Sequence, residues 1–276
     1  MQKGILKILV CPFLSLLSLV VFNGELSALS AKNVISGDFR MVVVGDILLH
    51  WKIQQQALRS GTASLWTNAS QLLSSGDVTI GNLEGPIAPS ALATQPYRKH
   101  VAPNFNFDVR TAGDLKNAGF DMLSVANNHT FDRRTAGARE THEVLSRARL
   151  TFSGSLDRDY DVFSNKGIKV GLVGCSMFYG GRDGITHCSS DKNKIRQAID
   201  DLVNKENANV VVVMPHWGNE HQEDPSSAMR TLANEYFEMG ADVVAGAHPH
   251  VLQRHEIKES VRDRLGRTKK RLVLYS

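Results

Sequence analysis

The chain has 276 residues, of which 42% are hydrophobic and 22% charged, and its formal net charge is +4 with histidine neutral. This composition supplies enough apolar material for a buried core. It excludes a disordered chain, a collagen-like repeat and a membrane protein with many spans. Domains of roughly 100–200 residues are usual. Because no linker divides the sequence, we expect one domain.

The N-terminus has the three parts of a secretory signal. A short basic start is followed by an apolar run from Ile8 to Phe22, and Ala28 and Ser30 suit the −3 and −1 positions of a cleavage site. The apolar run is short for a membrane span, which needs about 20 residues. We predict a signal peptide over residues 1–30 and an exported domain over 31–276, located in the periplasm or cell envelope. An uncleaved segment would instead keep the protein at the membrane.

Export would place the chain where disulfides can form. Cys175 and Cys188 are the only cysteines that follow the predicted cleavage site. Two cysteines alone do not decide between a disulfide and two free thiols.

A basic tract lies near the C-terminus. Residues 254–271 contain eight basic and three acidic side chains, a local charge of 8 − 3 = +5. The tract is either a solvated basic hairpin or a patch that attracts an acidic polymer or an anionic membrane surface. It lacks interleaved aromatic residues, and no nucleic-acid-binding motif is present, so nucleic acid is not an expected partner.

Short runs rich in valine, leucine and isoleucine alternate with amphipathic stretches along the chain. Such runs, bounded by glycine or polar residues, are typical of strands buried on both faces. The alternation predicts an α/β fold with a largely parallel sheet. In chain order, we expect a strand over 41–44, a helix over 50–74, a strand over 78–83, a helix over 109–118, a strand over 122–125, a helix over 135–148, strands over 161–165 and 170–173, a helix over 192–205, a strand over 210–214, a helix over 226–239, and strands over 243–245, 251–257 and 271–275. The strands at 161–165, 251–257 and 271–275 have hairpin character and indicate an additional sheet.

Polar side chains follow five of these strands. In open α/β sheets, ligands bind outside the carboxyl ends of the strands. A single polar cluster would be read as a turn or a helix cap, but clusters at five strand ends predict a metal site. The residues are Asp46; Asn82 and Glu84; Asn127, Asn128, His129 and Asp132; His216, Glu220 and His221; and His248 and His250.

The residue types constrain the metal. Carboxylate, carboxamide and imidazole groups without cysteine suit Mn, Fe or Zn in a hydrolytic centre better than a structural zinc site. Two such ions about 3.5–4 Å apart can clamp the attacking and leaving oxygens of a displacement. The sequence therefore predicts two divalent ions of undetermined identity.

Five motifs, GDILLH, GNLEG, ANNHTFD, PHWGNEH and GAHPHV, occur in this order from about Arg40 onwards. Together they resemble the signature of the bacterial capsule-synthesis CapA family, the poly-γ-glutamate synthesis or PGA_cap group. That family is similar to the calcineurin-like metallophosphoesterases. The resemblance implies a metallophosphoesterase-like four-layer α/β/β/α sandwich with a dinuclear metal centre.

The resemblance also implies roles for single residues. Asp46 and His250 would bind the first ion, and Glu84 would take the place of the bridging carboxylate. His129 would be the general acid or a stabiliser of the transition state. The second ion would be bound by Asn128, His216 and His248, while Asn82, Glu220 and His221 would orient ligands or contact substrate.

The sequence departs from the metallophosphoesterase pattern at two places. Leu48 stands where a ligand histidine usually lies, and Glu84 stands where aspartate is usual. His50 would compensate for the lost histidine or simply begin the next helix. CapA-like chains commonly continue beyond a tyrosine–serine pair, whereas this sequence ends at Ser276. The departures at positions 48 and 84 put ordinary phosphatase activity in doubt.

The leading functional hypothesis is an exported metal-dependent hydrolase that cleaves an amide or phosphoester. It would act in the synthesis, processing or export of capsular poly-γ-glutamate or a similar anionic envelope polymer. The alternative is a non-catalytic component that binds the polymer or assembles a capsule export complex. A general phosphodiesterase is the least favoured hypothesis.

Overall fold

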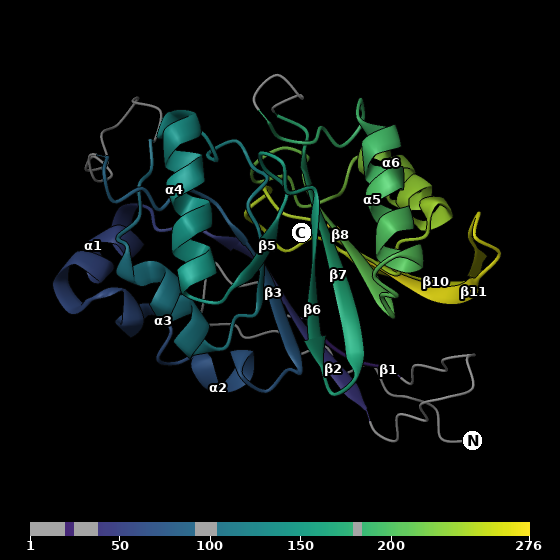
Figure 1. Cartoon of the computed structure of the whole chain (residues 1–276), viewed down its shortest axis with the longest axis horizontal. Helices are drawn as coiled ribbons and strands as arrows, with labels where there is room; N and C mark the ends of the chain where they lie inside the picture. The colour runs from purple at the N-terminus through teal and green to yellow at the C-terminus, as the bar shows by residue number, and fades with distance from the viewer. Residues whose placement is uncertain (1–19, 25–37, 92–103, 179–183) are drawn as a thin grey trace.

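A computed structural model describes residues 20–24, 38–91, 104–178 and 184–276 of the chain (Figure 1). No helix within these ranges is both long and apolar enough to cross a membrane. The elements are β1 Val20–Gly24, β2 Phe39–Ile47, α1 Trp51–Ser60, the 3-10 helix η1 Thr62–Leu65, α2 Ser70–Leu73, β3 Val78–Leu83, α3 Arg110–Ala118, β4 Met122–Ser124, α4 Arg134–Arg147, β5 Thr151–Ser153, β6 Tyr160–Asn165, β7 Ile168–Ser176, α5 Lys192–Asn204, β8 Val210–His216, α6 Ser227–Met239, β9 Val243–Ala245, β10 His255–Arg262 and β11 Thr268–Leu274.

The strands form two sheets. The first has the order β1-β2-β3-β4-β5 and the second the order β10-β11-β9-β8-β7-β6. Strands β2 to β5 are parallel, as are β7, β8, β9 and β11, whereas β1, β6 and β10 pair antiparallel at the sheet edges. The carboxyl ends of the parallel strands in each sheet therefore lie at one edge.

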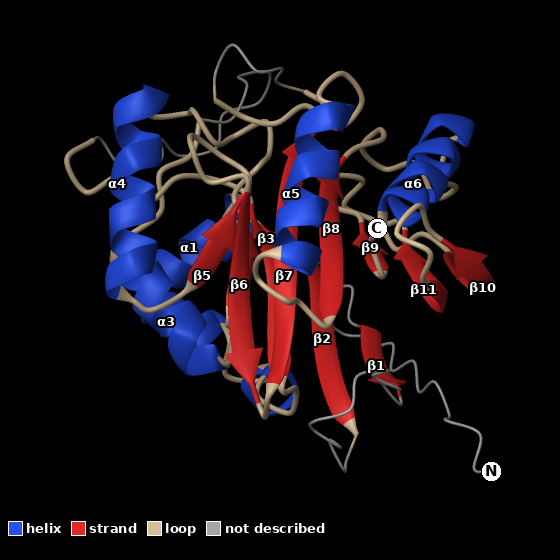
Figure 2. Cartoon of the chain, turned by 45° about the vertical axis from the view of Figure 1, so that its right-hand side comes forward, coloured by secondary structure: helices blue, strands red, loops and turns tan. Residues whose placement is uncertain are grey.

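The helices lie on the outside of the strands (Figure 2). Three apolar clusters separate the resulting four layers. One cluster lies between the two sheets, one between the first sheet and the helices that follow its strands, and one between the second sheet and α5 with α6. In β2, Met41 and Val43 belong to the inter-sheet cluster, while Val42 and Val44 belong to the helix-side cluster. Both faces of the strand are buried, as its unbroken apolar run predicts. The four-layer α/β/β/α arrangement is confirmed.

Several elements differ from the predicted ones. The strands expected to form an additional sheet, β6, β10 and β11, lie in the second sheet together with β7, β8 and β9. The helix expected over 50–74 is divided into α1, η1 and α2, because Gly61 takes a φ of 78° and ends α1. Glycine adopts this left-handed backbone without steric cost. The short strand β5 was not predicted, since three residues are too few for a periodic signal. Strand β10 begins at His255, four residues later than the predicted start at 251.

The first strand includes the end of the apolar run of the predicted signal peptide. Residues 20–24 pair with β2 as an antiparallel edge strand. Residues 1–19 and 25–37, including the predicted cleavage site, lie outside the described residues. Cleavage after residue 30 stays a prediction.

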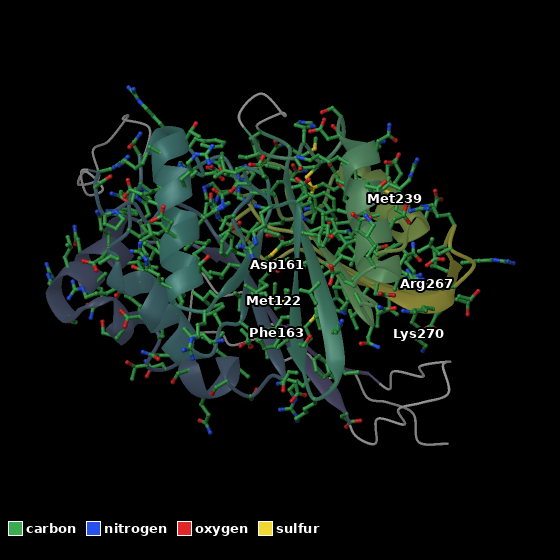
Figure 3. The ribbon with its side chains drawn as sticks, in the orientation of Figure 1. Met122, Asp161, Phe163, Met239, Arg267 and Lys270 are labelled. Atoms are coloured by element: carbon green, nitrogen blue, oxygen red, sulfur yellow. A yellow bond between two sulfur atoms is a disulfide. The ribbon has the colours of Figure 1, made fainter. Side chains whose placement is uncertain are left out.

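The basic tract forms the β10–β11 hairpin, where Arg267 and Lys270 are seen in Figure 3. Arg271 is 1% exposed and its guanidinium bonds the carboxylates of Asp242 and Asp263. Seven of the eight cations form ion pairs, namely Arg254, Lys258, Arg264, Arg267, Lys269, Lys270 and Arg271. Most of the local charge is thus balanced within the molecule, which favours the hairpin interpretation over an open cationic patch.

Cys175 and Cys188 form a disulfide, with their Cα atoms 5.1 Å apart. The bond joins the end of β7 to the segment that precedes α5. Both cysteines are fully buried in the cluster between the second sheet and its helices. The structure thus decides the question that the sequence left open.

Candidate metal centre

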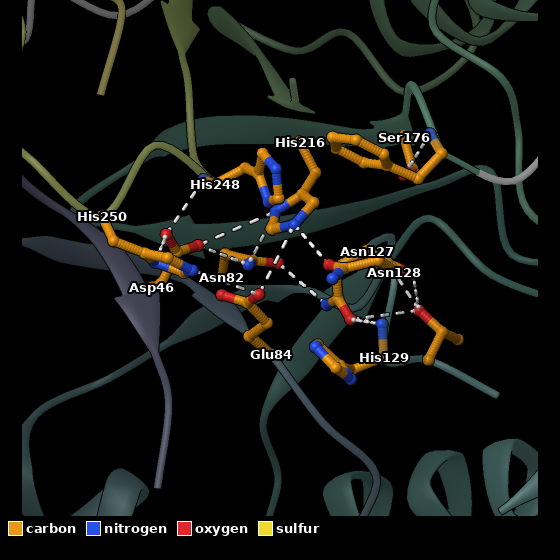
Figure 4. Close-up of polar contacts among 12 residues, drawn as sticks. Asp46, Asn82, Glu84, Asn127, Asn128, His129, Ser176, His216, His248 and His250 are labelled. Carbon is orange, nitrogen blue, oxygen red and sulfur yellow. Dashed lines mark hydrogen bonds and ion pairs between the residues drawn. The ribbon is translucent and has the colours of Figure 1, made fainter. Parts of the chain in front are cut away.

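The polar residues predicted from the strand ends meet at the seam between the two sheets (Figure 4). Asp46 lies in β2, Asn82 in β3 and His216 at the end of β8. The other residues lie in the segments that follow β3, β4, β8 and β9, so both sheets contribute to the cluster.

Asp46 connects the two halves of the cluster. Its Oδ1 accepts a hydrogen bond of 2.7 Å from Asn82 Nδ2, and its Oδ2 accepts one of 2.9 Å from the backbone N–H of His248. His250 Nδ1 lies 3.0 Å from the same Oδ2. Burial acts to raise the pKa of Asp46, but the bond from His250 and the two nearby imidazoles outweigh burial, so the pKa lies well below its usual range. Asp46 is therefore ionised at neutral pH.

A β-bulge in β2, just before Asp46, sets the direction of the Asp46 side chain. From Val43 to Asp46, β2 advances three residues while its partner β3 advances two, from Ile80 to Asn82. Such an extra residue kinks the strand and re-aims the side chains beyond it. The bulge lies directly before the first polar residue of the centre.

Two asparagines form a buried frame behind the carboxylates. Asn82 Nδ2 lies 3.2 Å from His216 Nδ1, and Asn82 Oδ1 accepts a 3.1 Å bond from Asn127 Nδ2. Asn127 Nδ2 also donates to the carbonyl oxygen of Leu83 at 2.8 Å. The orienting role of Asn82 stays a prediction, and no separate role was predicted for Asn127.

Glu84 lies at the centre of the cluster and is 1% exposed. Its Oε1 lies 3.6 Å from His216 Nε2 and 3.8 Å from His250 Nε2, while its Oε2 is buried without a hydrogen-bond partner. Burial, followed by the charge on Asp46, raises the pKa of Glu84 well above its usual value. A buried carboxylate in this state is a strong candidate for a cation ligand.

His216 and Asn128 face each other across the seam, with His216 Nε2 2.7 Å from Asn128 Oδ1. Burial lowers the pKa of His216 well below its usual value. The imidazole is therefore neutral at neutral pH, which is the form that binds metals.

His248 and His250 lie on a strained turn. Their φ values are 101° and 55°, in the left-handed region that residues other than glycine seldom occupy. Burial and the charge on His250 lower the pKa of His248 to about 4, and its Nδ1 is buried without a partner. The Phe178 ring packs on His248 with centroids 4.2 Å apart and lies 5.8 Å from the His216 ring. Strain of this kind is typical of functional sites.

His129 lies beside the cluster and is held through its Nδ1, which is 2.8 Å from Asp132 Oδ2. That carboxylate oxygen also accepts a 2.6 Å bond from the backbone N–H of Phe105. The Phe105 ring packs edge-on against His129, with centroids 4.5 Å apart. The imidazole is thus fixed on two sides, with Nε2 left for other partners.

Glu220 and His221 lie in the segment after β8, and both are exposed. The backbone N–H of His221 donates to the carbonyl oxygen of Pro249 at 2.8 Å, which holds this segment against the His248–His250 turn. The rings of His221 and His250 are 6.5 Å apart. Glu220 therefore lies beside His248 and His250.

The donor set fits divalent cations. Three groups of side chains each place one ligand atom per residue within 4.8 Å of the others: Glu84, His216 and His248; Asp46, Glu84 and His250; and Glu220, His248 and His250. Glu84 is shared by the first two groups, as a bridging ligand would be. The partnerless oxygen of Glu84 and nitrogen of His248 are buried groups that a cation would satisfy.

Some residues of the site carried no sequence signal. Phe178 and Phe105 pack on the imidazoles from outside the five motifs. Asp132 was noticed only as part of a polar cluster, although the spacing of three residues from His129 would allow the observed contact.

A family model described as bacterial capsule synthesis protein PGA_cap matches residues 40–276. The chain belongs to this family. Among PGA_cap relatives, it is 30% identical over 233 residues to a capsule biosynthesis protein CapA of Bacillus anthracis, covering 79% of this chain and 56% of that protein. It is 26% identical over 239 residues to a PGA biosynthesis protein CapA of Bacillus subtilis (strain 168), and the match covers 82% of this chain and 60% of that protein. The chain thus spans less than two thirds of the length of these relatives.

Solved structures support the fold. A phosphatase from Mycoplasma pneumoniae is similar with a TM-score of 0.52 and 14% identity, covering 86% of this chain and 70% of that one. A hypothetical protein from Thermus thermophilus has a TM-score of 0.50 and 18% identity, covering 86% and 75%. This PGA_cap chain therefore shares its overall fold with these two proteins.

Proposed function

We propose that this protein is an exported, metal-dependent hydrolase that acts in capsule synthesis on poly-γ-glutamate or a similar anionic envelope polymer. Membership of the PGA_cap family supports the role in capsule synthesis. The observation that carries the chemistry is the convergence of carboxylate, carboxamide and imidazole groups from both sheets into groups with ligand atoms within 4.8 Å. Oxygen and nitrogen donors without thiolate suit Mn, Fe or Zn in a hydrolytic centre.

The proposed ligands divide into two sets that share Glu84. Asp46 and His250 belong to one set, and Asn128, His216 and His248 to the other. Divalent ions held by these sets would polarise the scissile group and supply an activated water. The low pKa values of Asp46, His216 and His248 keep these groups in the deprotonated form that binds metals.

His129 is the proposed proton donor to the leaving group. Asp132 holds its Nδ1 at 2.8 Å and Phe105 packs against the ring, so Nε2 is oriented away from Asp132. Substrate binding requires only that the leaving atom come within hydrogen-bond reach of this nitrogen. An anionic polymer suits the centre, because bound cations attract carboxylates or phosphates.

The test is to incubate Mn-loaded protein with poly-γ-glutamate and, separately, with a chromogenic phosphodiester. We expect shortening of the polymer that disappears in His129→Ala, while the metal content of this variant stays the same. Absence of any stoichiometric metal in purified protein would contradict the proposal. Tight polymer binding without cleavage, unchanged in His129→Ala, would support the non-catalytic alternative, which the leucine at position 48 favours.

A further inference from the structure

The two proposed ligand sets are unequal. The set of Glu84, Asn128, His216 and His248 offers four donors, whereas Asp46, Glu84 and His250 offer three. The position that would supply a histidine to the smaller set is Leu48, whose side chain packs against the cluster between the first sheet and its helices. A further donor from another element would complete the smaller set.

Glu220 is the carboxylate placed to do so. The ligand atom of Glu220 lies within 4.8 Å of those of His248 and His250, so these three side chains form one of the candidate ligand groups described above. Among the described residues, Glu220 forms no ion pair. An exposed carboxylate without a cationic partner, next to two imidazoles, is free to bind a cation between them.

The backbone around Glu220 is fixed on both sides. Trp217 N–H donates to the carbonyl oxygen of Ala247 at 3.0 Å, and His221 N–H donates to that of Pro249 at 2.8 Å. Between them, Gly218 has a φ of 84° and lies so close to Met229 that a Cβ would be 3.0 Å from its sulfur. The segment that carries Glu220 is therefore held in register with the His248–His250 turn.

His50 was the other sequence candidate to replace the missing histidine. It stands at the N-cap of α1, and its ring packs against Phe105 with centroids 5.1 Å apart. It belongs to none of the three candidate ligand groups among the described residues. The geometry therefore favours Glu220 over His50.

We infer that Glu220 is a metal ligand beside His248 and His250, and that through His250 it adds a donor to the set that lacks a histidine at position 48. The inference rests on the proposed metal centre. It changes the predicted role of Glu220 from an orienting residue to a donor, and it places that donor on the solvent side of the cluster.

The experiment measures Mn²⁺ binding rather than activity. Protein stripped with a chelator and then freed of it is titrated with Mn²⁺, and free Mn²⁺ is followed by EPR. We expect two equivalents per chain for the wild type. For Glu220→Ala we expect one equivalent of unchanged affinity and a second weakened at least tenfold. Glu220→His, which keeps a donor, should retain both.

Two variants serve as controls. Glu223→Ala removes an exposed acid of the same segment that belongs to no ligand group, and it should retain both equivalents. His50→Ala should also retain both. Thermal unfolding of each metal-free variant should match the wild type, which excludes a folding defect.

Two results would overturn the inference in different ways. If Glu220→Ala binds Mn²⁺ as the wild type does, or His50→Ala alone loses an equivalent, Glu220 is not the missing ligand although the metal centre stands. If the wild type itself binds no Mn²⁺, both the centre and the role of Glu220 are refuted.

Discussion

Glu84→Gln should stabilise the metal-free protein and at the same time weaken its metal binding. Glu84 is 1% exposed, and one of its carboxylate oxygens has no hydrogen-bond partner. A buried polar group left unpaired costs about 1–3 kcal/mol, and more when it is charged. Glutamine keeps the shape of the side chain without the charge. We therefore expect the free energy of unfolding to rise by at least about 1 kcal/mol in chelator at alkaline pH.

The sign of the pH dependence follows from the raised pKa of Glu84. Between its ordinary pKa of 4.5 and its raised folded value, the folded protein binds a proton that the unfolded chain has lost. Stability of the wild type therefore falls as the pH rises through this window. Glutamine does not titrate, so the advantage of the variant should grow with pH and shrink towards pH 4.5.

Bound Mn²⁺ should reverse this order of stability, so that the wild type becomes more stable than Glu84→Gln. A ligand present at 100 times its Kd stabilises the folded state by about 2.7 kcal/mol. Thermal unfolding by calorimetry compares Glu84→Gln with the wild type both with and without Mn²⁺. A difference of about 1 kcal/mol corresponds to a shift of roughly 2–4 °C in Tm for a chain of this size. A variant that melts at or below the wild-type temperature in chelator at alkaline pH would refute the reasoning.

Three further outcomes are expected. Burial, with nearby arginines, lowers the pKa of His142 to about 4 in the folded protein. Between pH 6.5 and pH 4 the unfolded chain therefore binds a proton at this residue that the folded protein does not, so the free energy of unfolding falls as the pH falls through this window. In urea unfolding, His142→Gln should reduce this acid-induced loss of stability by about 1–2 kcal/mol, a figure lowered because the ring is partly exposed. An unchanged pH dependence would contradict the lowered pKa of His142. Arg271→Met removes the buried guanidinium shared by Asp242 and Asp263, which keep their bonds to Lys269 and Arg267, and should destabilise the protein by about 1.5–3 kcal/mol. The exposed control Arg262→Met should have little effect in the same assay. Asp132→Asn removes the carboxylate that holds His129 and should lower kcat at least about tenfold, because a positioned proton donor contributes about 10²–10⁴-fold. The Mn²⁺ content of the variant should be unchanged. A loss of Mn²⁺ equal to the loss of kcat would instead indicate a structural role for Asp132.

Much of the architecture follows from the apolar runs. The strand at 78–83 was predicted at its observed bounds, because buried strands need continuous apolar side chains and end where polar residues begin. The same rule brought together the residues of the candidate metal centre, since carboxyl ends of parallel strands share an edge. The break at Gly61 was harder to foresee, because a single glycine inside an amphipathic stretch is often tolerated within a helix.

The contacts between the polar groups could not be read from the sequence. Asp132 and Asn127 orient their neighbours through hydrogen bonds that depend on how β4 continues into α4. Phe178 reaches the imidazoles from the end of β7 on the second sheet, far from any motif. Contacts of this kind depend on tertiary packing and leave no periodic trace along the chain.

The donors at the seam come from two consecutive stretches of chain. Asp46, Glu84 and Asn128 come from residues 38–153, which build β2 to β5 of the first sheet, while His216, His248 and His250 come from residues 160–276, which build the second. Neither stretch alone holds a complete ligand set. A cation bound across the seam would stabilise only the docked pair of sheets. Metal uptake would then report that the two halves of the sandwich have come together, and a chain cut between β5 and β6 would regain its affinity only when the fragments reassociate.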